Sequence, residues 1–464
     1  MVFSSLTFLF IFLPAVLVFY FFLPGIKAKN AVLCLFSLVF YAWGEPVYIL
    51  LMLASILLNW LAGLGMERFP RRRKLLLILV LVFNLGAIGY FKYAGFFFSS
   101  LNSLFSLHLP ALQIALPIGI SFYTFQILSY VIDVYHGRTA AQKNLLSLAT
   151  YITMFPQLVA GPIVRYETVR EELTDRHITL NDFTEGLSRF FFGLGKKVLI
   201  ANQMALVADA VFDAAVLPPA GALWIGALCY TMQIYFDFSG YSDMAIGMGR
   251  MFGFHFTENF NYPYTADSVT DFWRRWHISL SSWFREYVYI PLGGNRCSAV
   301  RHIFNMLVVW LLTGLWHGAA WTFVLWGLYY GILLILEKYV LGGVLNRVPG
   351  VIRRIITFLL ILFGWIIFRS ESLPALGHFL SGAFSFNFSG TGTFFMSTAS
   401  ALSPLILLPI ALLGCLPWTR WLAKRFPASG VLSSLRLACA FFIWLTSIAM
   451  LLGESYNPFI YFRF

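Results

Sequence analysis

The sequence predicts an all-α polytopic membrane protein. Of its 464 residues, 59% are hydrophobic and 11% are charged, and the mean hydropathy is +0.78. A water-soluble globule of this length needs more polar residues to cover its surface. The chain also contains many apolar runs near the roughly 20 residues that span a bilayer as a helix. These two observations exclude an ordinary soluble enzyme.

The apolar runs predict about 11 to 13 membrane-embedded helices, of which the shorter ones are re-entrant or buried. The first run, Leu6–Leu23, follows a start without basic residues and precedes no small-residue cleavage site. We therefore interpret it as a retained helix and not as a secretion signal. In chain order, the expected helices span residues 6–24, 31–45, 47–66, 75–91, 115–132, 146–160, 190–213, 219–236, 303–317, 320–339, 353–369, 402–416 and 434–453.

The charge of the chain marks its topology. Lys and Arg number 32 and Asp and Glu number 20, so the net charge is +12. The basic residues lie in short clusters between apolar runs, which favours topology signals over a nucleic-acid-binding surface. The strongest cluster, Arg71–Lys74, is expected in the cytoplasm, which places the N-terminus outside. Beyond Tyr151, the polar stretch Arg165–Asn181 prevents a strict count of crossings.

The segment Tyr230–Arg301 differs from both ends of the chain because aromatic and ionisable residues alternate in it. Charged groups at membrane depth are costly and face a protein interior or a wet cavity. We therefore expect a polar cavity with aromatic walls. The alternative is a set of interfacial helices, and Ser282–Leu292 is expected to be interfacial. Ion pairs inside the core are expected for the ionisable residues Asp237, Asp243, Asp271, Arg274, Arg275 and Glu286.

Two of the eight histidines, His277 and His317, sit in apolar or aromatic frames, whereas the other six are expected near loops or interfaces. A buried histidine is usually a hydrogen-bonded structural residue. A desolvated imidazole also stays neutral, however, which makes it a competent base at pH 7. Trp316 supplies a flat apolar wall beside His317, and Gly318 leaves backbone space. Both histidines are therefore candidate catalytic residues.

Several strings around these histidines resemble the membrane-bound O-acyltransferase family, and within it the branch that O-acetylates bacterial cell-surface polysaccharides such as alginate. Further similar strings occur in the same order over most of residues 1–340. The strings that carry the resemblance include residues 89–93 (GYFKY), 116–125 (LPIGISFYTF), 160–163 (AGPI), 235–243 (YFDFSGYSD), 271–280 (DFWRRWHISL), 292–296 (LGGNR) and 314–318 (GLWHG).

The resemblance implies a ring of helices around a thin, funnel-like core. It implies a single membrane domain, residues 1–464, with N-terminal helices in 1–135, a catalytic core in 136–340 and C-terminal helices in 341–453. The implied location is the bacterial cytoplasmic membrane, in contact with lipid. The implied donor is cytoplasmic acetyl-CoA, with no bound cofactor or metal. An extracytoplasmic partner transferase of the serine-hydrolase-like SGNH type would serve a polysaccharide acceptor.

The family's essential histidine falls on His317 and its second histidine on His277. Acetyl transfer from a thioester to a hydroxyl needs a base, positioned reactants and hydrogen-bond donors for the developing oxyanion. We expect His317 to take the proton and His277 to orient the other reactant or relay the proton, or the two to exchange roles. Residues expected to contact the substrates are Trp273, Arg274, Arg275, Trp276, Trp316, Asn259, Asn261 and Asp237, with Arg274 or Arg275 near the phosphates of the donor.

The aromatic tail, residues 454–464, suggests how an acetyl group could cross the membrane. Tyr461 provides a hydroxyl in a segment similar to the tyrosine-bearing C-terminal motif of the small membrane partner in teichoic-acid D-alanylation. Tyr461 is therefore a candidate carrier of the acyl group. The alternative is an aromatic belt that anchors the last helix at the interface.

Two other functions remain open from the sequence. One is a transporter that exports a glycan or an acylated carrier, since intramembrane charge and interrupted helices also suit transport. The other is an acyltransferase of the same family that acts on teichoic acid with D-alanine, on lipid or on protein. Release of free CoA from acetyl-CoA would separate an enzyme from a transporter.

Overall fold

The computed structural model describes the chain except for residues 111, 113, 346, 399–401, 426–429 and 454–464. The described part consists of helices and loops and contains no β-strand, which confirms the all-α class. Eight helical segments of this part are long and apolar enough to cross a membrane, which confirms a multi-pass protein. They are Ile26–Gly44, Ile49–Arg68, Pro70–Phe105, Leu180–Phe212, Ala299–His317, Trp321–Leu345, Gly350–Arg369 and Ser434–Gly453.

The chain forms two compact units, which share the helices α10 (Leu180–Gly195) and α12 (Ala220–Met251). Unit 1 comprises Met1–Phe190 and Ser242–Thr257. Its other helices are η1 (Phe8–Phe12), α1 (Leu13–Phe22), α2 (Ile26–Gly44), α3 (Ile49–Arg68), η2 (Pro70–Arg72), α4 (Arg73–Ile88), η3 (Gly89–Tyr93), α5 (Ala94–Phe105), α6 (Ile120–His136), α7 (Leu145–Thr153), α8 (Phe155–Leu158) and α9 (Tyr166–Val169).

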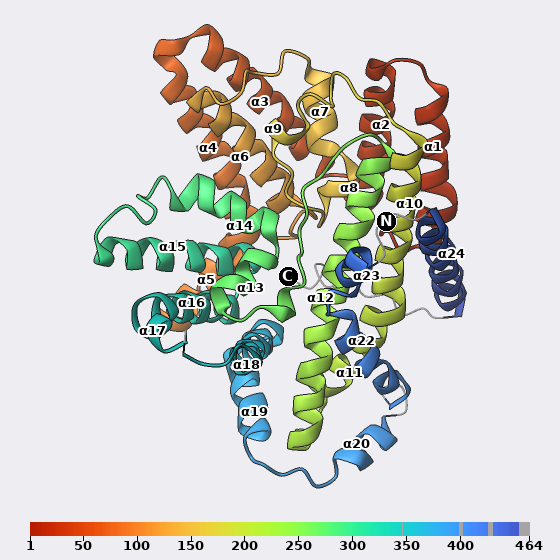
Figure 1. The fold of residues 1–464 in the computed structure, drawn as a ribbon. Helices are drawn as coiled ribbons and strands as arrows, with labels where there is room; N and C mark the ends of the chain where they lie inside the picture. Colours follow the sequence, from red (N-terminus) through yellow and green to blue (C-terminus); the bar gives the residue numbers. More distant parts are fainter. Residues whose placement is uncertain (111, 113, 346, 399–401, 426–429, 454–464) are drawn as a thin grey trace. The chain divides into compact units, whose positions relative to one another are not determined.

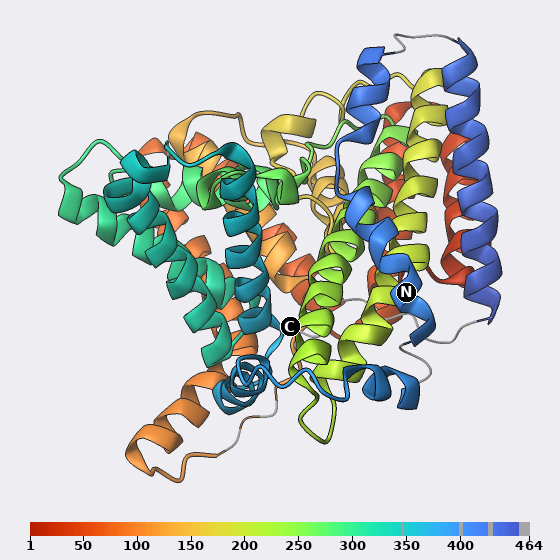
Figure 2. The same ribbon diagram turned by 60° about the horizontal axis from the view of Figure 1, so that its bottom comes forward.

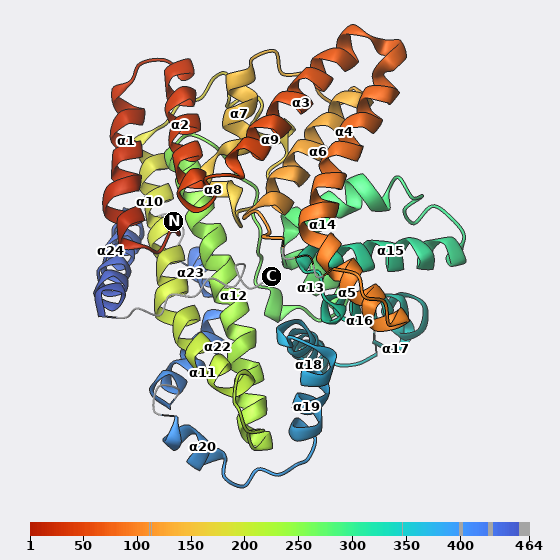
Figure 3. The same cartoon turned by 180° about the vertical axis from the view of Figure 1, so that it is seen from behind.

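Within unit 1, helices α3, α4 and α6 pack against one another, as Figure 3 shows from behind. A reciprocal pair of buried amides joins α3 to α4: Asn84 Nδ2 donates to Asn59 Oδ1 at 3.0 Å, and Asn59 Nδ2 donates to Asn84 Oδ1 at 3.3 Å. Such hydrogen bonds between helices satisfy polar groups that lipid cannot solvate.

Unit 2 comprises Phe191–Tyr241 and Glu258–Phe464. Within it, α16 packs against both α15 and α18 (Figure 1). Its helices besides α10 and α12 are η4 (Lys196–Ala201), α11 (Asn202–Phe212), η5 (Pro263–Thr265), α13 (Val269–Arg275), α14 (Ile278–Phe284), η6 (Arg285–Tyr289), α15 (Ala299–His317), α16 (Trp321–Leu336), η7 (Glu337–Leu341), α17 (Gly342–Leu345), α18 (Gly350–Arg369), α19 (Leu373–Ala383), α20 (Thr391–Ser397), η8 (Ser403–Leu407), α22 (Leu408–Gly414), α23 (Trp418–Arg425) and α24 (Gly430–Gly453).

Several predicted helix boundaries were wrong. The helix expected over 75–91 belongs to the longer helical segment Pro70–Phe105, and the one expected over 146–160 is divided into α7 and α8. The helix expected over 190–213 begins ten residues earlier, at Leu180, and the helix expected over 219–236 continues to Met251 as the 32-residue α12 (Figures 1 and 2). The polar string 235–243 therefore lies inside one helix. Its backbone groups are satisfied within the helix, and its carboxylates are paired with cations from other helical segments.

Most of the expected ion pairs are present. Lys197 pairs with Asp237 at 2.8 Å, Arg189 with Asp243 at 2.8 Å and Arg275 with Asp271 at 2.8 Å. Glu286 meets Arg285 at 3.5 Å, but the Arg285 side chain is mostly exposed. Arg274 is exposed and forms no hydrogen bond or ion pair with any described residue. The expectation of an ion pair was therefore wrong for Arg274.

Gly314 on α15 and Gly327 on α16 allow the two helices to meet backbone to backbone. A Cβ atom at Gly314 would overlap the carbonyl oxygen of Phe323, and one at Gly327 would overlap that of Trp310. Small residues of this kind let membrane helices approach closely. The contact brings Trp326 of α16 to His317 at the end of α15, with the ring centroids 5.1 Å apart.

A Gly314→Ala protein is expected to lose about 1–3 kcal/mol of stability, because the added methyl group forces two packed helices apart. The loss should appear as a lower thermal midpoint of the purified protein in detergent. Gly343→Ala is the matched control, since a Cβ atom there meets nothing within 4 Å. Equal midpoints for the two variants would contradict the importance of this contact.

Candidate active site

Unit 2 holds a cavity of about 640 Å³ between two walls. Helices α13 and α14 and the π-helical segment η6 form one wall, and α15 and α16 with the first residues of η7 form the other. The first wall contributes Trp273, Arg274, His277, Ser281 and Arg285, and the second contributes His302, Met306, Trp310, Thr313, Glu337 and Lys338.

Helix α13 is fixed at its N-terminus by two side chains. The Ser268 hydroxyl accepts a hydrogen bond from the backbone N–H of Asp271. The Glu337 carboxylate accepts from the N–H of Val269 at 2.8 Å and of Thr270 at 3.2 Å. Together they satisfy the free N–H groups of the first turn and place negative charge where the helix dipole favours it. The Glu337 contacts join η7 directly to α13, and both elements contribute residues that line the cavity.

His277 lies between α13 and α14 in a left-handed backbone conformation, with φ of 45°. This conformation is uncommon for a residue other than glycine and persists where surrounding bonds fix it. Here the backbone carbonyl of Asn259 accepts from the N–H of Ile278 at 3.0 Å, and Asn259 Oδ1 lies 3.1 Å from His277 Nδ1. The ring is 1% exposed, and burial lowers its pKa to about 3. His277 is therefore neutral at physiological pH.

Trp316 and His317 end helix α15, and Trp316 contacts both candidate histidines. Its ring centroid lies 5.8 Å from that of His277 and 4.9 Å from that of His317. His317 does not line the cavity, but it follows the lining residue Thr313 by one turn on the same face of α15. The structure thus brings the two histidines, 40 residues apart in the sequence, to one indole ring.

The cavity wall carries more positive than negative charge. Arg274, Arg285 and Lys338 line it, whereas Glu337, the one carboxylate among the described lining residues, accepts from the N-terminus of α13. Arginine and lysine side chains in this setting suit phosphate groups. The wall also includes the apolar rings of Trp273 and Trp310, whose centroids are 4.7 Å apart. The cavity therefore suits a ligand that is both anionic and partly apolar.

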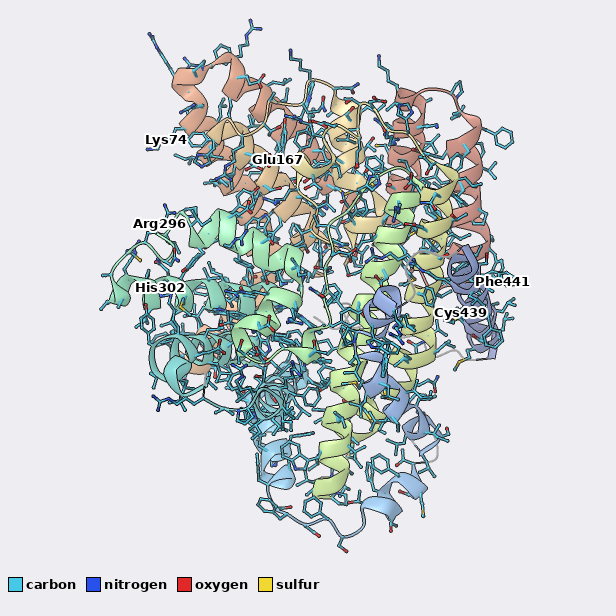
Figure 4. The ribbon with its side chains drawn as sticks, viewed as in Figure 1. Lys74, Glu167, Arg296, His302, Cys439 and Phe441 are labelled. Carbon is cyan, nitrogen blue, oxygen red and sulfur yellow. The ribbon has the colours of Figure 1, made fainter. Side chains whose placement is uncertain are left out.

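His302 was missed by the sequence analysis, which expected it near a loop or interface. It is 3% exposed, and its ring lies between two tyrosines: Tyr289 Oη is 2.7 Å from Nε2 and Tyr339 Oη is 2.8 Å from Nδ1. Figure 4 labels His302 on α15, after the loop that carries Arg296. A signal was present in the sequence, because His302, Met306, Trp310 and Thr313 follow helical spacing and share one face.

Other predicted site residues lie outside the cavity lining. Trp276 packs on Trp365, with centroids 4.8 Å apart, and Arg275 is held by Asp271. The Asn261 backbone N–H donates to the Arg275 carbonyl at 2.9 Å, and Asp237 is paired with Lys197. Of the predicted substrate contacts, Trp273 and Arg274 line the cavity. The proposed carrier Tyr461 lies outside the described residues.

Comparison with known proteins places the cavity within a shared region. The model of the membrane-bound O-acyltransferase family matches residues 141–371, which include every residue that lines the cavity. The chain is 46% identical to a probable alginate O-acetylase of Pseudomonas aeruginosa, over 83% of this chain and 75% of that protein. It is 41% identical to a probable alginate O-acetylase of Pseudomonas putida over the full length of both. It is 36% identical to a peptidoglycan O-acetyltransferase of Helicobacter pylori, over 83% and 80% of the two chains.

Proposed function

Because the chain belongs to the membrane-bound O-acyltransferase family and is an O-acyltransferase, we propose that it moves acetyl groups across the bacterial cytoplasmic membrane for O-acetylation of a cell-surface polysaccharide. The observation that carries the proposal is the similarity, along the whole chain, to a protein named as a probable alginate O-acetylase. The peptidoglycan enzyme among the relatives supports a glycan acceptor. Membership in a family of acyltransferases also favours an enzyme over the transporter considered from the sequence.

The donor in this proposal is acetyl-CoA, bound in the cavity of unit 2. CoA carries phosphate groups, which cannot enter the hydrocarbon and need cationic partners. Arg274, Arg285 and Lys338 supply such partners on the cavity wall. Arg274 is the clearest of the three, because it lines the cavity and makes no ion pair with a described residue.

An Arg274→Gln protein is expected to show a KM for acetyl-CoA about 10-fold higher, which corresponds to about 1.4 kcal/mol, with kcat unchanged. The loss falls on KM because phosphate contacts are the same before and during the reaction. Steady-state release of free CoA measures both constants. Arg347→Gln is the matched control, since Arg347 is also exposed but does not line the cavity. Equal KM values for the two variants would remove Arg274 from the donor site.

The chemistry needs no activation of the donor, since a thioester is already reactive. What the protein supplies is position, a base for the attacking hydroxyl and a donor for the developing oxyanion. We assign the roles of base and oxyanion donor to His277 and His317, whose rings both contact the ring of Trp316. The acyl group in this proposal is acetyl, as in the names of the three relatives described above, and not D-alanyl or a long acyl chain.

The acetyl group must still reach the outer face of the membrane. In this proposal Tyr461 accepts it from acetyl-CoA as an aryl ester, and a serine-hydrolase-like SGNH transferase outside the membrane then collects it for the polysaccharide. The support is the sequence of the aromatic tail, in which Tyr461 is the one hydroxyl among the last four residues.

The test is to incubate membrane vesicles that contain the full chain with labelled acetyl-CoA and to analyse the C-terminal peptide by mass spectrometry. The expected result is one acetyl group on Tyr461 in the wild type, none in a Tyr461→Phe protein and little in a His317→Ala protein. Phenylalanine keeps the ring and deletes only the nucleophile. Full surface acetylation by Tyr461→Phe would overturn the carrier role, and absence of CoA release by the wild type would overturn acetyl-CoA as donor.

A further inference from the structure

Asn259 holds the ring of His277 through a single oxygen atom. Asn259 Oδ1 accepts from the backbone N–H of Ser279 at 3.3 Å and from its hydroxyl at 2.9 Å, and it lies 3.1 Å from His277 Nδ1. The Ser279 hydroxyl oxygen also lies near Nδ1, at the longer distance of 3.5 Å. A backbone N–H can only donate a hydrogen bond. The Asn259 atom that faces it is therefore the oxygen, and the amide group cannot be turned around without losing that bond.

This orientation determines where the hydrogen of the neutral imidazole lies. The single hydrogen of the Ser279 hydroxyl is donated to Asn259 Oδ1, so both oxygen atoms near His277 Nδ1 present lone pairs to it. Nδ1 therefore carries the hydrogen, and Nε2 carries a lone pair. Nε2 is buried and has no hydrogen-bond partner among the described residues. A buried nitrogen with an unused lone pair is costly unless it serves a reactant. His277 also lines the cavity in which we place the donor.

We propose that Asn259 is a positioning residue that locks His277 in the tautomer with hydrogen on Nδ1 and so makes Nε2 the base of acetyl transfer. This inference rests on the proposed function. It exchanges the roles first expected for the two histidines: His277 takes the proton, and His317 donates to the oxyanion. The sequence expectation for Asn259 was a direct substrate contact, whereas its side chain here acts on another side chain.

The step balances with these groups alone. The acceptor hydroxyl gives its proton to His277 Nε2 while its oxygen forms a bond to the carbonyl carbon of the thioester. The carbon–sulfur bond then breaks, and the proton on Nε2 passes to the sulfur, which leaves as the thiol of CoA. His277 returns to its starting tautomer, because Nδ1 keeps its hydrogen bond to Asn259 throughout.

Two replacements of Asn259 separate tautomer control from mere packing. Asn259→Leu keeps the approximate volume but removes the acceptor, and we expect CoA release to slow at least about 100-fold with KM for acetyl-CoA unchanged. Asn259→Asp keeps an acceptor oxygen for both His277 Nδ1 and the Ser279 N–H, and we expect its rate to stay within about 10-fold of wild type. Thr231→Val is a matched control, because it removes a buried hydroxyl whose hydrogen bond stays inside α12. Equal losses in the Leu and Asp variants would overturn the proposal.

A second measurement does not depend on turnover. NMR of the full chain with isotope-labelled histidine nitrogens reports which ring nitrogen carries hydrogen, and a His277→Gln sample assigns the signal. The expected result is a hydrogen on Nδ1 in the wild type and a mixture of tautomers in Asn259→Leu. A hydrogen on Nε2 of the wild type would overturn the inference even if acetyl transfer occurs. Absence of CoA release with the expected tautomer would instead overturn the proposed function.

Discussion

A His317→Ala protein is expected to transfer acetyl about 10²–10³-fold more slowly than the wild type, because in the mechanism proposed above it loses one hydrogen-bond donor to the developing oxyanion. KM for acetyl-CoA should stay within about twofold, since His317 lies beyond the residues that line the cavity. Steady-state release of free CoA by the purified chain gives both values. A fall in kcat alone would place His317 in the chemical step.

His255→Ala provides the comparison for this variant. His255 is exposed, lies in unit 1 and contacts Glu172, so its loss should leave both constants unchanged. The double variant His277→Ala/His317→Ala should be little slower than the slower single variant, because groups that act in one step are not additive. A His317→Ala protein that is correctly folded and fully active would contradict the two-histidine site.

The sequence predicts the membrane class and most helix positions because a helix that spans the lipid must be apolar over about 20 residues. The expected helix 47–66 is observed as Ile49–Arg68, and the expected helix 353–369 as Gly350–Arg369. The rule failed where polar residues continue a helix. Leu180–Arg189 and Asp237–Met251 are helical although they are polar or mixed, because ion pairs such as Arg189–Asp243 satisfy their charges.

Part of the candidate site was predictable from local composition and not from the length of apolar segments. Ionisable and aromatic residues close together in an apolar chain identified Trp273, Arg274 and His277, which all line the cavity. Contacts between distant segments could not be deduced from spacing. The oxygen of Asn259 that orients His277 lies 18 residues away in the chain. Likewise, η6 and η7, which are distant from each other in the chain, each bring a tyrosine to the buried ring of His302.

The largest loss of stability is expected from breaking the ion pair between Lys197 and Asp237. Lys197 Nζ lies 2.8 Å from Asp237 Oδ1, and the two side chains are 4% and 1% exposed. Lys197→Met removes this cation from beside a buried carboxylate, which should cost about 3–5 kcal/mol of unfolding free energy. Thermal and denaturant unfolding of the purified protein in detergent measures the loss.

The double variant Lys197→Met/Asp237→Leu distinguishes a structural role of this ion pair from a role in acting on the substrate. If the pair is structural, removing both charges should restore most of the stability, because apolar replacements of a buried pair are often neutral or better. Arg353→Gln is the control, since it breaks a partly exposed pair with Asp267 and should cost at most about 1 kcal/mol. A stable double variant without CoA release would show that Asp237 or Lys197 acts on the substrate. A Lys197→Met protein as stable as wild type would contradict the argument that the buried Asp237 carboxylate is costly without its cation.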